Sequence, residues 1–500
     1  WLRAGATLTP EFIARNPLRD QFTALMQTKL GYKPLVDSTG AIADILGKKE
    51  VYYDWLRSGG GHSTITELSR ENLKRALTTL RGSKSILSKL NIITKMQDLS
   101  QLMEQATRLG VYKAARQKGL SSVEAGFQSR EATVDFARIG SSIKEPNRLI
   151  AFFNANLQGL DKSIRTAAQD PKGLAVKGTS LITAPSVLLY LLNRQDPDYR
   201  ELPNWQKNLF WMFKYPGTDT YVRIPKPFLY GQVFGSVPER FLEYADRKDP
   251  RLIDSLKKSL VGSLSPVAGD PENITELAAA ILPTALKPII ENFANRSSFL
   301  GRPIVPESKK DLRPSEQYGR STTETAKAVG RTLEVSPAKF ENLVGGYGGG
   351  LGRYALQIGD RIIEQVDKIV GKAPARTKPT EVTDIPLVKG FTSRAHLTSP
   401  ESVNEFYDNR EAAETDYRTA RELFNRNDDE GAKKILKDGN AEFYQLTQKA
   451  GKALSKLNTY ADELVKSGKY DSAELKRKLA EIDRQQLDIA RKVNKVIRAK

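Results

Sequence analysis

The last hundred residues carry an apolar repeat that limits what this part of the chain can fold into. Bulky or apolar positions recur every three or four residues in three successive runs, which start at Val403, Phe443 and Leu475. Side chains at this spacing fall on one side of an α-helix. The runs predict three helices with narrow apolar seams, the last opening at an Asp471-x-x-Glu474 capping box. The seams suit either a helical hairpin or three-helix bundle packed on itself, or a coiled-coil contact with a neighbouring subunit.

The same period recurs between Thr64 and Lys118, whereas no long alternation of apolar and polar residues is present. The sequence therefore predicts an all-α, multi-segment helical protein with Pro/Gly-rich extended arms. At most one short β-hairpin is expected, because the run at 218–227 is β-like but flanked by Pro and Gly. The segment at 420–436 also resembles one tetratricopeptide-type helix-turn-helix unit, although a solenoid needs several stacked copies.

Length and composition divide the chain further. With 500 residues, 27% of them charged and no cysteine, the chain is long enough for several cores, and disulfides and thiolate sites are excluded. We expect six stretches, which are an N-terminal helical region with basic helices (1–143), a central helical core (144–298), a Pro-rich charged arm (299–334), a Gly-rich turn plus helix (335–371), an extended linker (372–400) and the heptad-patterned helices (401–500).

Residues that could carry chemistry are few. The two histidines, His62 and His396, are far apart and have no metal-site spacing, and no serine lies in a nucleophile elbow. The Gly-rich run at 345–356 lacks the lysine of a phosphate loop, so a flexible turn that lets Tyr347 and the next helix pack closely is the better interpretation. We therefore expect no catalytic, cofactor-binding or metal-binding residue in this chain.

The formal net charge of +19 favours polyanionic partners. Residues 70–118 include eleven Lys and Arg but only three acids. This stretch therefore predicts either a solvated helix face or a nonspecific contact with DNA phosphates. The residues expected to make that contact are Lys74, Arg75, Arg81, Lys84, Lys89 and Lys95.

Two apolar stretches, 178–193 and 274–290, bear on membrane contact. Both contain proline, and about 20 residues are needed to span a bilayer, so neither is expected to cross one alone. Buried core helices are the plain expectation. The alternative is a segment that is buried in one state and lies at a membrane interface in another.

Several ordered motifs resemble the C-terminal helical region of large polyvalent proteins encoded by bacteriophages and related mobile elements. They begin with "TLTPEFIARNPLRDQFTALMQTKLGYKPLVD" (7–37) and "EPNRLIAFFNANLQGLDKSIR" (145–165). They continue with "VRIPKPFLYGQVFGSVPERFLEY" (222–244), "VSPAKFENLVGGYGGGLGRYAL" (335–356) and "TDIPLVKGFTSR" (383–394). The resemblance covers about residues 1–425 and implies a segment of a longer polypeptide, which would suit a chain that starts at Trp1.

The resemblance implies a non-catalytic internal virion, or ejection, protein that assists delivery of the phage genome. Its implied partners are further copies of itself, the portal or other internal virion proteins, phage DNA without sequence preference, and a host membrane during ejection. Its implied location is the virion interior near the portal, then the host envelope or cytoplasm. Two alternatives stay open: a helical scaffold of a giant virion-carried polymerase or protease whose active site lies elsewhere, and a nonspecific DNA-binding helper delivered to the host.

The resemblance carries over no active-site residue, but its tight motifs suggest structural roles. Arg19 and Asp20 are expected to form a buried ion pair or a cap. Asn154 and Asn156 are expected to satisfy buried backbone groups, and Asp161 belongs to the same motif.

Overall fold

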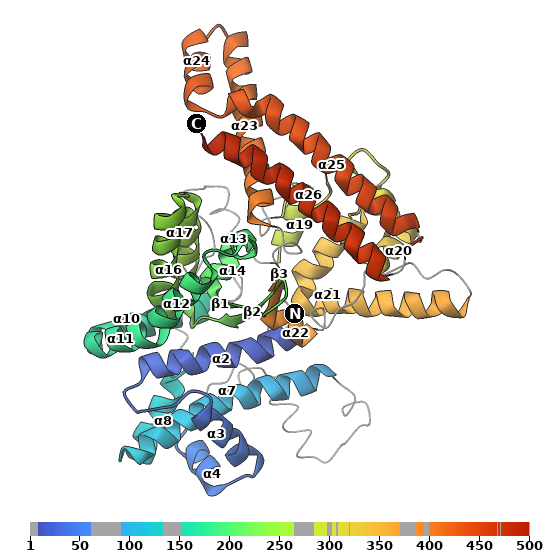
Figure 1. The fold of residues 1–500 in the computed structure, drawn as a ribbon. Helices are drawn as coiled ribbons and strands as arrows, with labels where there is room; N and C mark the ends of the chain where they lie inside the picture. The colour runs from blue at the N-terminus through green and yellow to red at the C-terminus, as the bar shows by residue number, and fades with distance from the viewer. Residues whose placement is uncertain are drawn as a thin grey trace.

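The computed structural model describes residues 9–61, 92–133, 153–264, 285–297, 303–306, 309–319, 321–370, 386–394, 400–467, 469–470 and 472–499. These residues are mainly helical with one small antiparallel sheet, so the all-α prediction is confirmed. The N-terminal helices form one end of the molecule, the sheet and its helices the middle, and the long C-terminal helices the other end (Figure 1).

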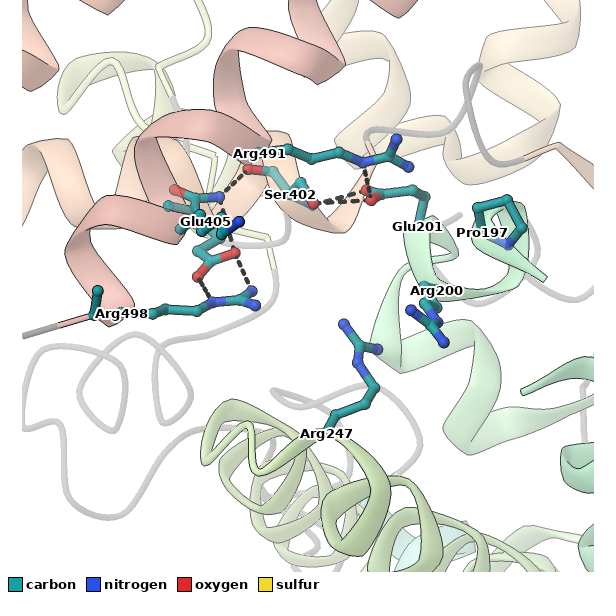
Figure 2. Close-up of a pocket in the computed structure, with 11 residues that line it drawn as sticks. Pro197, Arg200, Glu201, Arg247, Ser402, Glu405, Arg491 and Arg498 are labelled. Atoms are coloured by element: carbon teal, nitrogen blue, oxygen red, sulfur yellow. Dashed lines mark hydrogen bonds and ion pairs between the residues drawn. The ribbon is translucent and has the colours of Figure 1, made fainter. Parts of the chain in front are cut away.

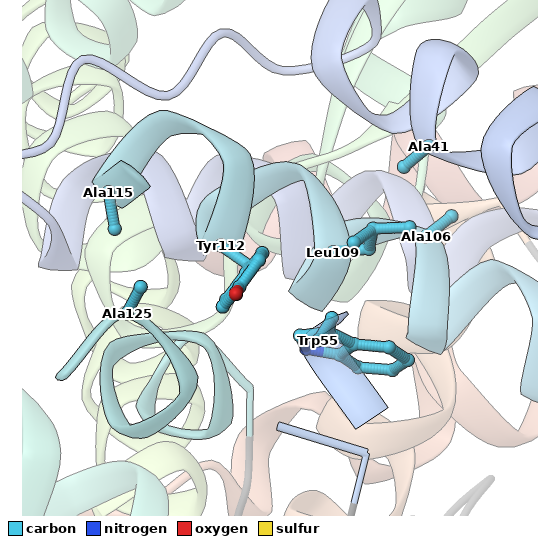
Figure 3. Close-up of a cluster of buried hydrophobic side chains, with 7 residues drawn as sticks. All are labelled: Ala41, Trp55, Ala106, Leu109, Tyr112, Ala115 and Ala125. Atoms are coloured by element: carbon cyan, nitrogen blue, oxygen red, sulfur yellow. The ribbon is translucent and has the colours of Figure 1, made fainter. Parts of the chain in front are cut away.

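The N-terminal helices pack around a buried tryptophan. They are α2 (Pro10–Gln27), α3 (Val36–Leu46), α4 (Glu50–Arg57), α7 (Ile92–Gln117) and α8 (Ser122–Glu131). Trp55 is fully buried against Leu109 and Tyr112 of α7, as Figure 3 shows. Its indole Nε1 donates to Ser129 Oγ at 2.9 Å, which satisfies the polar atom of an otherwise apolar side chain.

The central part combines short helices with a hairpin. Its elements are α10 (Phe153–Gln169), α11 (Pro171–Gly178), the π-turn η2 (Thr179–Thr183), α12 (Ala184–Asn193), α13 (Pro197–Glu201), α14 (Asn204–Leu209), β1 (Phe210–Lys214), β2 (Thr220–Pro225), α15 (Phe228–Gly231), the π-turn η3 (Gln232–Ser236), α16 (Val237–Arg247) and α17 (Arg251–Leu264). The expected hairpin is present, with Phe210 opposite Pro225.

A third strand joins the hairpin from far along the chain. Strand β3 (Thr392–Arg394) pairs antiparallel with β2 and places Ser393 opposite Tyr221. It follows α22 (Pro386–Phe391), which packs against α2. The end of the stretch predicted as an extended linker is therefore a helix and a strand, because β2 offers an edge to which that segment can add.

The stretches predicted as an arm and a Gly-rich turn also contain more helix than expected. The elements here are α19 (Lys287–Phe293), the short turn η5 (Pro314–Glu316), α20 (Glu324–Leu333) and α21 (Pro337–Ile369). Two helical segments of α21 meet within the Gly-rich run, at Gly349, whose φ of 55° and ψ of −139° suit only glycine. The expected turn into a following helix is therefore present, as a kink with helix on both sides. Tyr347 packs beside the kink and donates to the Ala285 carbonyl at 2.9 Å.

The C-terminal helices form the predicted bundle. Helices α23 (Glu401–Asn425), α25 (Tyr444–Ser467) and α26 (Ser472–Arg498) pack together, and α24 (Asp429–Asp438) folds back on α23, with the turn η7 (Ala441–Phe443) before α25. Their seams meet in two apolar clusters, one around Phe406 and Leu454 and one around Leu464 and Ile482. The helices thus bury their seams against one another. Asp471 lies outside the described residues.

The apolar stretch at 178–193 differs from its prediction in two respects. Pro185 does not break it, because α11, η2 and α12 run on as one helix in which a π-turn directly precedes Ala184. It is also not a buried core helix, since Leu188 and Leu192 are 58% and 70% exposed. Of the other stretch, 274–290, only its end, in α19, lies within the described residues.

Candidate functional site: an arginine-lined pocket beside a buried charge cluster

Five charged side chains lie together in the interior of the central part. Lys207 comes from α14, Lys226 from the end of the hairpin, and Glu239, Arg240 and Glu243 from α16; each is at most 4% exposed. Lys226 Nζ contacts Glu239 Oε2 at 2.6 Å, and Arg240 Nη2 contacts Glu239 Oε1 at 2.6 Å. Arg240 also pairs with Glu243, which holds Lys207 at 3.2 Å. We call these five residues the charge cluster.

Burial and pairing compete in the charge cluster. Burial acts to raise the pKa of Glu243, but Arg240, Lys207 and Arg247 outweigh it and hold that pKa at about 2. Burial lowers the pKa of Lys226, and the neighbouring Glu239 offsets only part of the effect. Three cations against two carboxylates leave one positive charge in excess, and the Nε of Arg240 has no hydrogen-bond partner.

The charge cluster reaches the surface through Arg247. Its Nη1 donates to Glu243 Oε1 at 2.6 Å, and the same guanidinium borders a pocket of about 520 Å³. The pocket lies between the central part and the C-terminal bundle, with α13 and α16 on one side and α23 and α26 on the other (Figure 2). Five cations and two carboxylates line it: Arg200, Arg247, Arg491, Lys495 and Arg498, with Glu201 and Glu405. We call it the arginine pocket.

Both carboxylates of the arginine pocket already have partners, and those of Glu201 join the central part to the C-terminal bundle. Glu201 on α13 accepts from the backbone N and the Oγ of Ser402 at 3.1 and 2.9 Å, and from Arg491 at 2.8 Å. Glu405 on α23 accepts from Arg498 Nε at 2.7 Å and Nη2 at 2.6 Å. We call the side formed by α13 and α16 the near wall. Its one lining carboxylate, Glu201, is held by Ser402 and Arg491 of the far wall, which leaves two cations on the near wall.

Arg200 and Arg247 form that near wall. Figure 2 shows their guanidinium groups extending toward each other into the opening. Arg200 donates to the Arg194 carbonyl at 3.3 and 3.2 Å, and no carboxylate among the residues that the structure describes forms an ion pair with it. A second hollow of about 500 Å³ shares Arg200, Arg247 and Arg498 and adds Arg194, with Asp246 as its one acid.

This arrangement is suited to binding an oxyanion. Guanidinium groups match phosphate oxygens in geometry and stay charged at all physiological pH values. Two adjoining hollows that share three arginines would accept successive phosphates of a polymer as readily as one small anion. No group of three or more His, Cys, Asp or Glu able to hold a metal occurs among the residues that the structure describes.

Only part of the basic stretch expected to contact DNA lies within the described residues. Lys74, Arg75, Arg81, Lys84 and Lys89 lie outside the described residues, and Lys95 on α7 is exposed. Further along α7, Arg108 is fully buried and pairs with Glu104, and Lys113 pairs with Asp44 at 2.5 Å. These two cations hold the N-terminal helices together and are not part of a free basic face.

The structure gives Arg19 and Asp20 separate partners instead of the expected ion pair. Arg19 lies over the rings of Phe210 and Phe228, 5.5 Å from each centroid, whereas Asp20 accepts from Asn16 Nδ2 at 2.8 Å. The expected cap of α2 is instead Thr9, whose Oγ1 accepts from the Phe12 backbone N.

The other motif residues are divided between exposed and undescribed positions. Asp161 is an exposed partner of Arg165 one turn along α10. The side chains of Asn154 and Asn156 lie outside the described residues, as do both histidines.

Sequence reasoning missed the charge cluster and the arginine pocket. The motifs "VRIPKPF" and "VPERFLEY" do contain Lys226, Glu239, Arg240 and Glu243, and charged residues held between prolines and aromatics were the available signal. The pocket cannot be assembled from sequence, since its cations come from three distant places in the chain: position 200, position 247, and one face of the last helix at 491, 495 and 498.

Comparison with known proteins supports part of the resemblance. No curated protein and no solved structure matches the chain. Residues 196–388 match a family model described as large polyvalent protein associated domain 38, a span that begins just before α13 and ends within α22. The match is narrower than the resemblance expected over residues 1–425. The part of the chain that holds the hairpin, the charge cluster and the near wall of the arginine pocket is therefore similar to a domain of large polyvalent proteins.

Proposed function

We propose that this chain is a non-catalytic segment of a phage-encoded large polyvalent protein and that it binds the phosphate backbone of phage DNA through the arginine pocket. The observation that carries the proposal is the near wall of that pocket, where the Arg200 and Arg247 guanidiniums extend into the opening. The net charge of +19 and the match to a polyvalent-protein domain at 196–388 support it.

Backbone binding without sequence reading follows from the residues involved. Reading bases requires a helix or ribbon that enters a groove, and the cations here instead lie in a hollow between packed helices. Arginine contacts to phosphate fix position and affinity but carry no sequence information. In this proposal the protein is packed with the genome in the virion interior near the portal, oligomerises with further copies and other internal proteins there, and assists delivery into the host.

DNA binding is tested by fluorescence anisotropy of a labelled duplex at several salt concentrations. The test variant is Arg200→Ala/Lys495→Ala, which removes two exposed cations of the pocket that form no ion pair among the described contacts. We expect weaker binding to all sequences and a log K against log salt slope that is shallower by about two, one for each phosphate contact.

The matched control is Lys33→Ala/Arg331→Ala, which removes two exposed cations far from the pocket and lowers the net charge equally. If both double variants lose the same affinity, binding is due to overall charge, and the pocket has no special part in it.

Delivery is tested separately by mass spectrometry of purified virions before and after DNA release. Peptides of this chain should be present in filled particles and lost on ejection. Absence from filled particles would contradict the delivery role and would favour an enzyme scaffold or a helper that acts inside the host.

A further inference from the structure

Two neighbouring helices of the central part bury polar side chains and expose large apolar ones. The continuous helix Pro171–Asn193 turns Ser186, Tyr190 and Asn193 toward the protein, at most 6% exposed, while Leu188 and Leu192 are 58% and 70% exposed. A helix on a soluble protein normally shows the reverse pattern, with leucines inward and polar groups outward.

Hydrogen bonds fix this orientation. Ser186 Oγ accepts from Trp211 Nε1 at 2.7 Å, and Asn193 Nδ2 donates to the Met212 carbonyl at 2.8 Å. Rotating the helix to bury its leucines would leave these buried polar groups unpaired, which is costly. The exposed leucine face is therefore built into the native packing.

Helix α16, which packs against α12, repeats the pattern. Its buried residues are the charged Glu239, Arg240 and Glu243, whereas Phe241 is 56% exposed and Tyr244 is 37% exposed. The charge cluster thus satisfies the inner face of α16 while the outer face is aromatic. Large exposed apolar surfaces of this kind indicate a partner of matching chemistry.

The charge pattern indicates what that partner is. Residues 178–193 contain no Asp, Glu, Lys or Arg, and the exposed Lys172 and Arg194 lie at the two ends of the helix. The cation just before the apolar stretch, Lys177, is half-buried and donates to the Leu25 and Thr28 carbonyls. Among the described residues, this helix is the one that is long and apolar enough to cross a membrane, with 23 residues and a mean hydropathy of 1.4, and only 22% of that apolar window is buried.

A second copy of the chain fits less well than a membrane. Antiparallel pairing of two such helices would place Lys172 of one copy near Arg194 of the other, and parallel pairing would place like residues together, so cations would face cations in both cases. An anionic lipid surface accepts both flanking cations and the leucines between them.

We propose that the outer face of the helix Pro171–Asn193, with Phe241 and Tyr244 of α16 beside it, inserts into one leaflet of an anionic lipid bilayer. The helix lies in the membrane plane, with Leu188 and Leu192 at the boundary of headgroups and acyl chains. The rest of the chain remains outside the bilayer, attached through the inner face of the helix, where Leu174 and Ile182 are buried with the polar residues. This inference stands on its own observations and does not depend on the DNA proposal.

The absence of cysteine allows a direct test on the full chain. A Leu188→Cys variant carries one environment-sensitive fluorophore, and a Leu46→Cys variant, at a leucine 68% exposed on α3, is the matched control. With vesicles of phosphatidylcholine and phosphatidylglycerol, the label at 188 should shift to the blue and be quenched by an acyl-chain quencher, whereas the label at 46 should not. An unchanged label at 188 would overturn the proposal. A blue shift without lipid that grows with protein concentration would also overturn it, because it would indicate a second copy on this face.

A second variant measures affinity. Leu188→Asp/Leu192→Asp should weaken binding to these vesicles about tenfold or more, since burial of two leucine side chains is lost. Circular dichroism should be unchanged, because both positions are exposed. Unchanged vesicle affinity would contradict the proposal. Loss of DNA binding in Arg200→Ala/Lys495→Ala with vesicle insertion intact would confirm that the two proposals can fail independently.

Discussion

Replacing Glu239 by glutamine should locally destabilise the central part more than any surface change. The Glu239 carboxylate compensates Lys226 and Arg240, each at 2.6 Å, and accepts from the Tyr199 hydroxyl at 2.7 Å. In Glu239→Gln the shape is kept, but the fully buried Lys226 ammonium loses its carboxylate. Removing one partner of a buried ion pair costs about 3–5 kcal/mol.

Hydrogen exchange measured by mass spectrometry reports this cost locally, which matters in a chain with several packing units. Peptides covering residues 226–243 should lose protection by roughly two to three and a half powers of ten, since each 1.4 kcal/mol is a factor of ten. Peptides of the C-terminal bundle should change little. The control Glu422→Gln breaks an exposed pair with Arg426 and should cost less than about 1 kcal/mol.

A double variant sharpens the test. Lys226→Met/Glu239→Gln removes the stranded ammonium together with its partner and should recover part of the lost protection. The reasoning is refuted if Glu239→Gln lowers protection less than tenfold. It is also refuted if the double variant loses as much protection as Lys226→Met alone and Glu239→Gln alone lose in sum.

Three further predictions concern the N-terminal helices and the α21 kink. Burial raises the pKa of Asp20 from its ordinary 3.8 to about 8. Between these values the folded chain binds more protons than the unfolded chain, so its stability should fall as the pH rises through them. Asp20→Asn should remove this pH dependence from thermal unfolding measured at stepped pH, and an unchanged profile would contradict the prediction. Gly349→Ala should cost about 1–3 kcal/mol, read as lost exchange protection around residues 337–369, because φ of 55° with ψ of −139° strains any other residue. Trp55→Ala should cost about 3–5 kcal/mol by emptying the core beside α7, and unchanged protection of α4 and α7 would count against that core.

The sequence pattern predicts the helices well wherever one face of each helix is apolar and packs on its neighbours. The C-terminal bundle is the clearest case, because Phe406 and Leu464 bury where the three-and-four-residue spacing places them. The hairpin is also readable from its local turn signals. Strand β3 is not, because its pairing depends on β2, which is far away in sequence.

The central part departs from the usual pattern, and the sequence predictions fail there for that reason. A prediction that buries apolar residues places Leu188 inside and Glu239 outside, whereas the structure does the opposite. The carboxylates of α16 can be buried because Lys207 and Lys226 converge on them from separate segments of the chain. Such compensation is a property of tertiary structure and has no local signature.

The arginine pocket could not be predicted from the sequence, for a related reason. A run of basic residues such as 70–118 stands out by counting, but two of its described members, Arg108 and Lys113, are paired with carboxylates. Arg200 and Arg247 do not stand out in this way, and nothing in the sequence places them next to the basic end of the chain around Arg498. They become one cationic surface when the C-terminal bundle docks on α13 and α16.

The measurement that tests the central claim most directly is cross-linking of the full chain to duplex DNA, followed by identification of the attached peptides by mass spectrometry. The account predicts cross-links on α13, on the end of α16 and on the last turns of α26, which together line the arginine pocket. Cross-links confined to residues 62–118, with none on those three helices, would contradict it and would return the DNA contact to the basic N-terminal stretch.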